Sequence, residues 1–193
     1  MYREVLRDGR FFALLLKVDE ERAARVQAAG CPQCGGPLHA GHFERKPRGV
    51  LQGTTPPPEG YAMRFDWCCG ECRRRTLPAS VRFLGRKVYL AVANAIATLL
   101  VRGNDRGALK LLRGELGASR STLRRWRAWW QGLVGSAPWQ RLRGQLPVDL
   151  DESRLPGSLL ERWAGSCTDQ MMALLRLLAL ESPGFPGTLG EWR

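Results

Sequence analysis

Two short stretches, CPQCGG at residues 31–36 and CCGEC at residues 68–72, decide the fold of the segment between the helical parts of this 193-residue chain. Each holds a C-x-x-C pair, a spacing that lets both sulfurs of one turn reach a single ion. Zn²⁺ prefers four tetrahedral ligands, so two such turns predict one structural zinc ion with no open position for catalysis. The predicted ligands are Cys31, Cys34, Cys69 and Cys72.

Other interpretations of this region are weaker. Cys68 offers a competing spacing, but we prefer Cys69 as the ligand and expect Cys68 to be buried or beside the site. His39 and His42 are expected to be ordinary strand or turn residues, because four thiolates already complete the coordination shell. A disulfide or a thioredoxin-like redox pair is disfavoured, since neither an export signal nor a βαβ pattern is visible.

We call the two C-x-x-C turns knuckles, and the strands that are expected to join them a zinc ribbon. A helix is expected before this ribbon. Apolar and polar residues alternate from Tyr61 to Trp67, which is typical of a strand that leads into the second knuckle. A loop rich in proline and glycine is expected over residues 46–60. Residues 2–29 are predicted to be helical, and Gly30 is expected to end that helix.

Beyond the ribbon, residues 87–134 are predicted to be helical, with breaks near residues 103–104 and 116–118. Ser119 can cap the helix that follows the second break. On that helix an apolar stripe is expected to pack on the core. A second stripe carries hydrogen-bond donors suited to a DNA major groove. Trp129 is expected at the surface. The apolar stripe consists of Leu123, Trp126, Trp130 and Leu133. The polar stripe consists of Arg120, Arg124, Arg127 and Gln131, flanked by Ser121 and Arg125.

The net charge of +12 is concentrated in one part of the chain. Residues 78–135 hold 11 basic and 2 acidic side chains, whereas residues 136–193 hold 6 basic and 7 acidic ones. This asymmetry favours a polyanionic partner for the basic window. No apolar run is long enough to span a bilayer, and no secretory signal is visible, so we expect a cytoplasmic, nucleoid-associated protein.

The segment LGASRSTLRRW, residues 116–126, closely resembles the LGVSxxTLxRW turn-and-recognition-helix signature of transposases and related bacterial DNA-binding proteins. A zinc ribbon followed by a helix-turn-helix is similar to the DNA-binding region of DDE-type insertion-sequence transposases, over about residues 31–134. The resemblance implies double-stranded DNA as the partner. Further phosphate contacts are expected from Arg73, Arg74 and Arg75, which follow the second knuckle.

Catalysis is not expected from this sequence. The segment 147–153 is similar to the strand that bears the first catalytic acid of such transposases, but only 41 residues follow Glu152. Cleavage by two metal ions needs several converging carboxylates, and these cannot be assembled here. Asp151 and Glu152 are expected in a loop or at a helix start, where acids favour the helix dipole. We therefore predict a protein that is not an enzyme.

The predicted fold is α+β and mainly α, with four segments. These are an N-terminal helical segment 1–30, a zinc ribbon 31–86, a three-helix helix-turn-helix unit 87–134, and a linker with a C-terminal helical segment 135–193. A linker is expected over residues 135–148 and an amphipathic helix over 168–180. Its apolar face is assigned to the core, with a transposase, a recombinase or a second copy as the alternative partner, and Cys167 is expected to be buried.

The leading functional prediction is a zinc-stabilised, sequence-specific double-stranded DNA-binding protein that serves as a transposition accessory factor or a transcriptional regulator. One alternative is an RNA-binding zinc-ribbon protein, because ribbons and basic helices also occur in RNA-associated proteins. The other is a truncated form or partner subunit of a DDE transposase.

Overall fold

The computed structural model describes residues 2–46, 48–50, 56–84, 90–100, 113–144, 146 and 149–180. The chain is a mixed α and β protein in which short antiparallel strands lie between helical segments, in agreement with the predicted α+β class. The helices are η1 (Tyr2–Arg7), α1 (Gly9–Ala29), α2 (Ala91–Leu100), α4 (Arg120–Val134), α5 (Ala137–Arg143), η2 (Glu152–Arg154), α6 (Gly157–Leu160) and α7 (Cys167–Leu180). The strands are β1 (Leu38–Ala40), β2 (Phe43–Glu44), β3 (Met63–Arg64), β4 (Trp67–Cys69) and β5 (Arg75–Thr76). Residues 113–116 are also helical.

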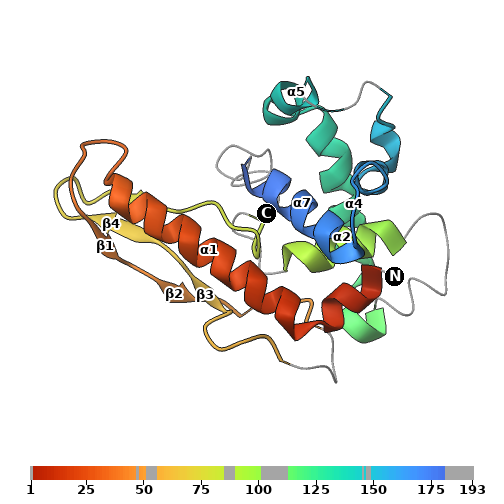
Figure 1. Cartoon of the computed structure of the whole chain (residues 1–193), viewed down its shortest axis with the longest axis horizontal. Helices are drawn as coiled ribbons and strands as arrows, with labels where there is room; N and C mark the ends of the chain where they lie inside the picture. The colour runs from red at the N-terminus through yellow and green to blue at the C-terminus, as the bar shows by residue number, and fades with distance from the viewer. Residues whose placement is uncertain are drawn as a thin grey trace.

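Helix α1 runs along the long axis of the molecule and joins its two parts (Figure 1). The Asp8 side chain caps the helix by accepting a hydrogen bond from the Arg10 amide at 2.9 Å, and Gly30 ends it at a φ of 77°. The N-terminal half of α1 buries Phe11, Phe12 and Leu15 in the main core, whereas its C-terminal half packs on the strands. The predicted helix over residues 2–29 is therefore confirmed, with a break at Asp8.

The strands form one long, bent antiparallel hairpin with a short third strand at its end. β1 pairs with β4, which places Leu38 opposite Cys69, and β4 pairs with β5, while β2 pairs with β3 further along the hairpin. The predicted strand from Tyr61 to Trp67 is interrupted where the ring of His42 inserts, with its Nδ1 3.1 Å from the Asp66 amide nitrogen. This interruption shifts the alternation, so Asp66 is buried, contrary to the period-2 pattern.

Helices α2 and α7 lie at the N-terminal end of the chain, where both pack against η1 (Figure 1). Helix α2 packs against η1, α4 and α7, and the indole Nε1 of Trp130 donates to Asn94 Oδ1 at 2.9 Å. Trp126 and Trp130 are buried, as predicted, but the expected surface position of Trp129 is wrong because it is buried as well. Its ring packs edge-on against Trp130, with centroids 5.0 Å apart.

The predicted linker over residues 135–148 is wrong, because it contains α5. The Ser136 hydroxyl accepts a hydrogen bond from the Trp139 amide at 3.2 Å, which satisfies an orphan donor of the first helical turn. Trp139 is only 1% exposed, so the helix is anchored in the core. The predicted C-terminal helix over 168–180 is confirmed as α7, with its apolar face in the main core.

A buried polar cluster connects α1 to the ribbon. The Asp19 carboxylate accepts hydrogen bonds from the Val81 amide at 2.8 Å and from Arg82 Nε at 2.8 Å, and both side chains are almost fully buried. The guanidinium of Arg82 also donates to the backbone carbonyls of Tyr61 at 2.6 Å and Met63 at 2.9 Å. This network fixes the position of the ribbon on the helix. Within the described ranges, no helix combines the length and apolarity needed to cross a membrane.

Candidate metal centre and nucleic-acid interface

The two knuckles bring the four predicted ligand cysteines together at the end of the ribbon. Their Sγ atoms all lie within 4.8 Å of one another, with Cys31 to Cys72 at 3.6 Å and Cys34 to Cys69 at 3.5 Å. A disulfide would need about 2.05 Å, whereas Zn–S bonds of about 2.3 Å in a tetrahedron place sulfurs about 3.8 Å apart. The four cysteines could therefore hold one metal ion, and they are not paired as disulfides.

Backbone geometry shapes both knuckles. After the first pair, the Gly35 amide donates to the Cys31 carbonyl at 2.8 Å, and Gly35 has a φ of 73°, which suits glycine. The knuckles meet at Gly36, where an added Cβ would lie 2.6 Å from the Glu71 side chain and 3.2 Å from Cys69 Sγ. A side chain at position 36 would therefore have to displace Glu71 and would press on the sulfur of Cys69.

Backbone hydrogen bonds lower the pKa of two of the thiols, but the net shifts of these two pKa values have opposite signs. The pKa of Cys31 is lowered to about 7, mainly by a hydrogen bond from the backbone N–H of Gln33 and also by one from that of Cys34. Desolvation raises this pKa but does not outweigh the hydrogen bonds. The backbone N–H of Arg74 lowers the pKa of Cys72, but desolvation and hydrogen bonds with the other thiols outweigh it, and that pKa is raised to about 12. Four thiolates in so small a space need a cation to balance their charge.

The remaining cysteines and histidines lie outside this cluster. Cys68 points to the opposite face of β4 from Cys69, as alternation along a strand requires, so Cys69 is the member of the cluster. His42 packs edge-on against Trp67 with centroids 4.7 Å apart, and His39 is exposed on β1. Cys167 begins α7 and is half-buried against the main core, whereas full burial was predicted.

The predicted recognition helix presents a basic surface. Ser119 caps α4 by accepting a hydrogen bond from the Thr122 amide at 3.1 Å, and Gly117 has a φ of 59° in the preceding turn. We call the exposed side of α4 the arginine face. It comprises Arg120, Ser121, Arg124, Arg125, Arg127 and Gln131, all exposed. No acidic residue occurs in α4, and among the described residues Arg120, Arg124 and Arg127 form no ion pair.

The arginines after the second knuckle differ in their availability. All three are exposed, but Arg75 is paired with the buried carboxylate of Asp66 and donates to the Gly41 carbonyl at 3.1 Å. Arg74 donates to the amide oxygen of Gln33 at 3.0 Å, across the two knuckles. These contacts give Arg74 and Arg75 roles in holding the ribbon together, beyond the phosphate contacts predicted for them.

The acidic residues near position 151 are engaged locally. Asp151 caps η2 by accepting from the Ser153 amide at 3.0 Å, and Glu152 accepts from Arg143 Nε at 2.9 Å and from Trp139 Nε1 at 3.0 Å. Both positions match the predicted helix start. Across the described ranges, the cysteine cluster is the single group of three or more cysteine, histidine or acidic side chains close enough to share an ion.

A comparison with protein-family models, curated proteins and solved structures gives no match for this chain.

Two features of this region were missed by sequence reasoning. One is the pair Asp19 and Arg82, which are separated by 63 positions and carry no motif. The other is a cavity beside α4, formed by segments that are distant in sequence. No local signal could have found either of them.

Proposed function

We propose that this protein is a zinc-stabilised, sequence-specific double-stranded DNA-binding protein. The arginine face of α4 carries this proposal. It carries four arginines, and the helix has no acidic residue, so this surface is positively charged and attracts a polyanion. The width of a major groove admits an α-helix, and an arginine can pair with guanine in bidentate fashion or with phosphate.

The packing of α4 supports a rigid recognition helix. Six buried side chains hold its other face, and the Ser119 cap fixes its first turn. A helix locked in this way loses little conformational entropy when it binds, so its arginines are already oriented. The resemblance of residues 116–126 to the transposase signature favours the first helical turn as the part that reads bases, within a transposition accessory factor or a transcriptional regulator.

Zinc is the metal that best fits the cysteine cluster. Four thiolates in a tetrahedral arrangement are the ligand set of structural zinc sites. Zinc would hold the ribbon at the end of α1, and no open coordination position would remain for water. The proposed role of the ion is therefore structural.

The direct test is selection of binding sites from random duplex DNA with the zinc-loaded full chain, followed by shift assays on the selected sequence. We expect one enriched motif and a clear preference over scrambled duplexes. Structured RNA is the competitor, and its preferential binding would contradict the DNA proposal. Cleavage of the selected duplex with Mg²⁺ that is lost on Asp151→Ala would indicate transposase chemistry instead.

Replacing Arg124 by alanine is expected to weaken binding to the selected duplex by about 1–3 kcal/mol if the side chain reads a base. The reason is the loss of a bidentate contact, which also relaxes the preference at one position of the motif. Fluorescence anisotropy with the full set of single-base variants measures both effects. Arg176→Ala on α7 removes the same charge from another exposed surface and should leave affinity nearly unchanged. A uniform loss across all sequences would show that Arg124 touches only phosphate.

Affinity for duplex DNA should fall steeply with salt. Each phosphate neutralised by the protein contributes about −0.9 to the slope of log K against log salt concentration. We therefore expect the slope to become about one unit shallower when an arginine of the arginine face that contacts phosphate is replaced by alanine. Titrations between low and moderate salt give this slope, and a flat response in the parent protein would contradict the polyanion proposal.

A further inference from the structure

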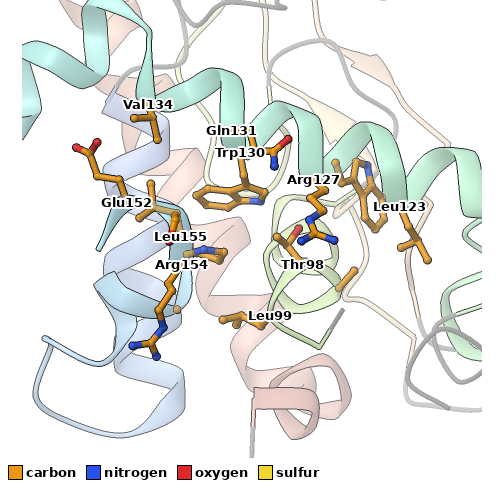
Figure 2. Close-up of a pocket in the computed structure, with 15 residues that line it drawn as sticks. Thr98, Leu99, Leu123, Arg127, Trp130, Gln131, Val134, Glu152, Arg154 and Leu155 are labelled. Atoms are coloured by element: carbon orange, nitrogen blue, oxygen red, sulfur yellow. The ribbon is translucent and has the colours of Figure 1, made fainter. Parts of the chain in front are cut away.

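A cavity of about 440 Å³ lies beside the arginine face, within the range of about 300–1,000 Å³ that is usual for small-molecule sites. It is lined by the C-terminal half of α2, by one side of α4 and by residues 152–157, which run from η2 into α6. Figure 2 shows Trp130 of α4, Thr98 of α2 and Leu155 around a common space, whereas the charged end of Arg154 points away from it. Because the segments are distant in sequence, the cavity exists only in the folded protein.

The wall that α4 gives to the cavity is largely apolar and aromatic. Trp126, Trp130 and Leu123 line the cavity from α4. Leu155 lies near the ring of Trp130 (Figure 2). The Nε1–H of Trp130 is already used by Asn94 at 2.9 Å, so this donor is not available to a ligand. Trp126 is 4% and Trp130 is 3% exposed, so the accessible edges of the two indoles form an apolar wall that suits the apolar body of a small molecule.

The polar groups of the cavity leave one charge available. Glu152 is bonded to Arg143 and Trp139, and Arg154 is paired with Glu161 at 2.6 Å, so these charges are balanced. Arg127, by contrast, forms no ion pair among the described residues, and its guanidinium points toward Thr98 across the cavity (Figure 2). A guanidinium beside apolar walls favours an anionic group.

We infer that this cavity binds a small organic anion, with its apolar body against the wall formed by the two indoles and Leu155, and its carboxylate or sulfonate on Arg127. The same arginine belongs to the arginine face. If α4 binds DNA as proposed above, the ligand and the duplex compete for one side chain, and the ligand lowers the affinity for DNA. This coupling rests on the proposed function, whereas the binding of the anion does not depend on it.

The test compares two dyes with the same aromatic skeleton, anionic 1-anilinonaphthalene-8-sulfonate and neutral N-phenyl-1-naphthylamine, in fluorescence titrations of the zinc-loaded protein. We expect the anionic dye to bind about tenfold more tightly, a difference of about 1.4 kcal/mol, because only its sulfonate can accept a charge-assisted hydrogen bond from Arg127. Arg127→Gln should remove this difference and leave the neutral dye unchanged. Arg176→Gln, which removes a charge outside the cavity, should keep the difference.

Two further measurements locate the site and separate the two proposals. The indole N–H resonances of Trp126 and Trp130 should shift on titration, and Thr98→Phe, which places an aromatic ring in the cavity near Arg127, should weaken the binding of both dyes. Equal affinities for the dyes, or a preference that survives Arg127→Gln, would overturn the inference. In a duplex-binding assay, saturating anionic dye should weaken the binding of DNA. If the dye binds but the affinity for DNA is unchanged, the coupling alone is overturned. If the protein does not bind duplex DNA at all, the proposed function alone is overturned.

Discussion

Replacing Cys34 by serine is expected to remove the metal from the protein and to unfold the ribbon. Cys34 supplies one of the four sulfurs, and its loss leaves three thiols and an incomplete tetrahedron. Binding of structural zinc contributes about 10–16 kcal/mol to the folding of small zinc-finger peptides, so little stability remains without it. Elemental analysis should find about one zinc per chain in the parent protein and far less in the variant. Hydrogen exchange should show lost protection over residues 31–77.

The small size of the ribbon's own core explains why the effect should be so large. Five buried residues form this core, and two of them, Cys31 and Cys69, are themselves in the metal cluster. Burial of the other three, Ala23, Leu38 and Trp67, cannot offset the backbone entropy of ordering the hairpin.

Cys68→Ser is the matched control for this prediction, because Cys68 is adjacent in sequence but lies outside the cluster. It should keep the zinc content and the exchange protection of the parent. A Cys34→Ser protein that retains one zinc and a folded ribbon, or a Cys68→Ser protein that loses both, would contradict the four-cysteine site.

Local chemistry explains which parts of this fold could be predicted from the sequence. Paired cysteines, the Ser119 cap and the glycine at 117 each act within a few residues, so their spacing is visible in the chain. The choice of Cys69 over Cys68 also follows from local alternation once the strand is placed. These signals identified the cluster and the boundaries of α4.

Features that depend on tertiary packing were beyond such reasoning. The linker prediction failed because its turn residues are also good helix starters, and burial of Trp139 decides the outcome in favour of α5. The prediction of a surface position for Trp129 failed because helical periodicity shows where the apolar stripe of a helix lies but not how wide its buried face is. The arginine at 64 lies in a strand whose alternation suggested an outward position, yet it is buried and donates to the Pro78 carbonyl at 2.6 Å.

Replacing Asp19 by alanine is expected to destabilise the protein by about 3–5 kcal/mol, because it leaves the guanidinium of Arg82 buried without a counter-charge. Asp19 is 1% exposed and Arg82 is fully buried, so water cannot replace the lost carboxylate. The Val81 amide loses its acceptor as well, and an unsatisfied buried donor adds to the cost. Urea unfolding followed by circular dichroism, at saturating zinc, measures the change in free energy.

The controls for this prediction separate the buried pair from the helix that carries it. Glu20→Ala removes an exposed carboxylate from the next position of α1 and should cost less than about 0.5 kcal/mol. Asp19→Leu combined with Arg82→Met removes both charges, and the double variant should be more stable than Asp19→Ala, since no charge is left unpaired. Comparable losses for Asp19→Ala and Glu20→Ala would show that the pair does not hold the ribbon on α1. Zinc content near one ion per chain in every variant would confirm that the loss arises at this pair, because the metal site is separated from it along the helix.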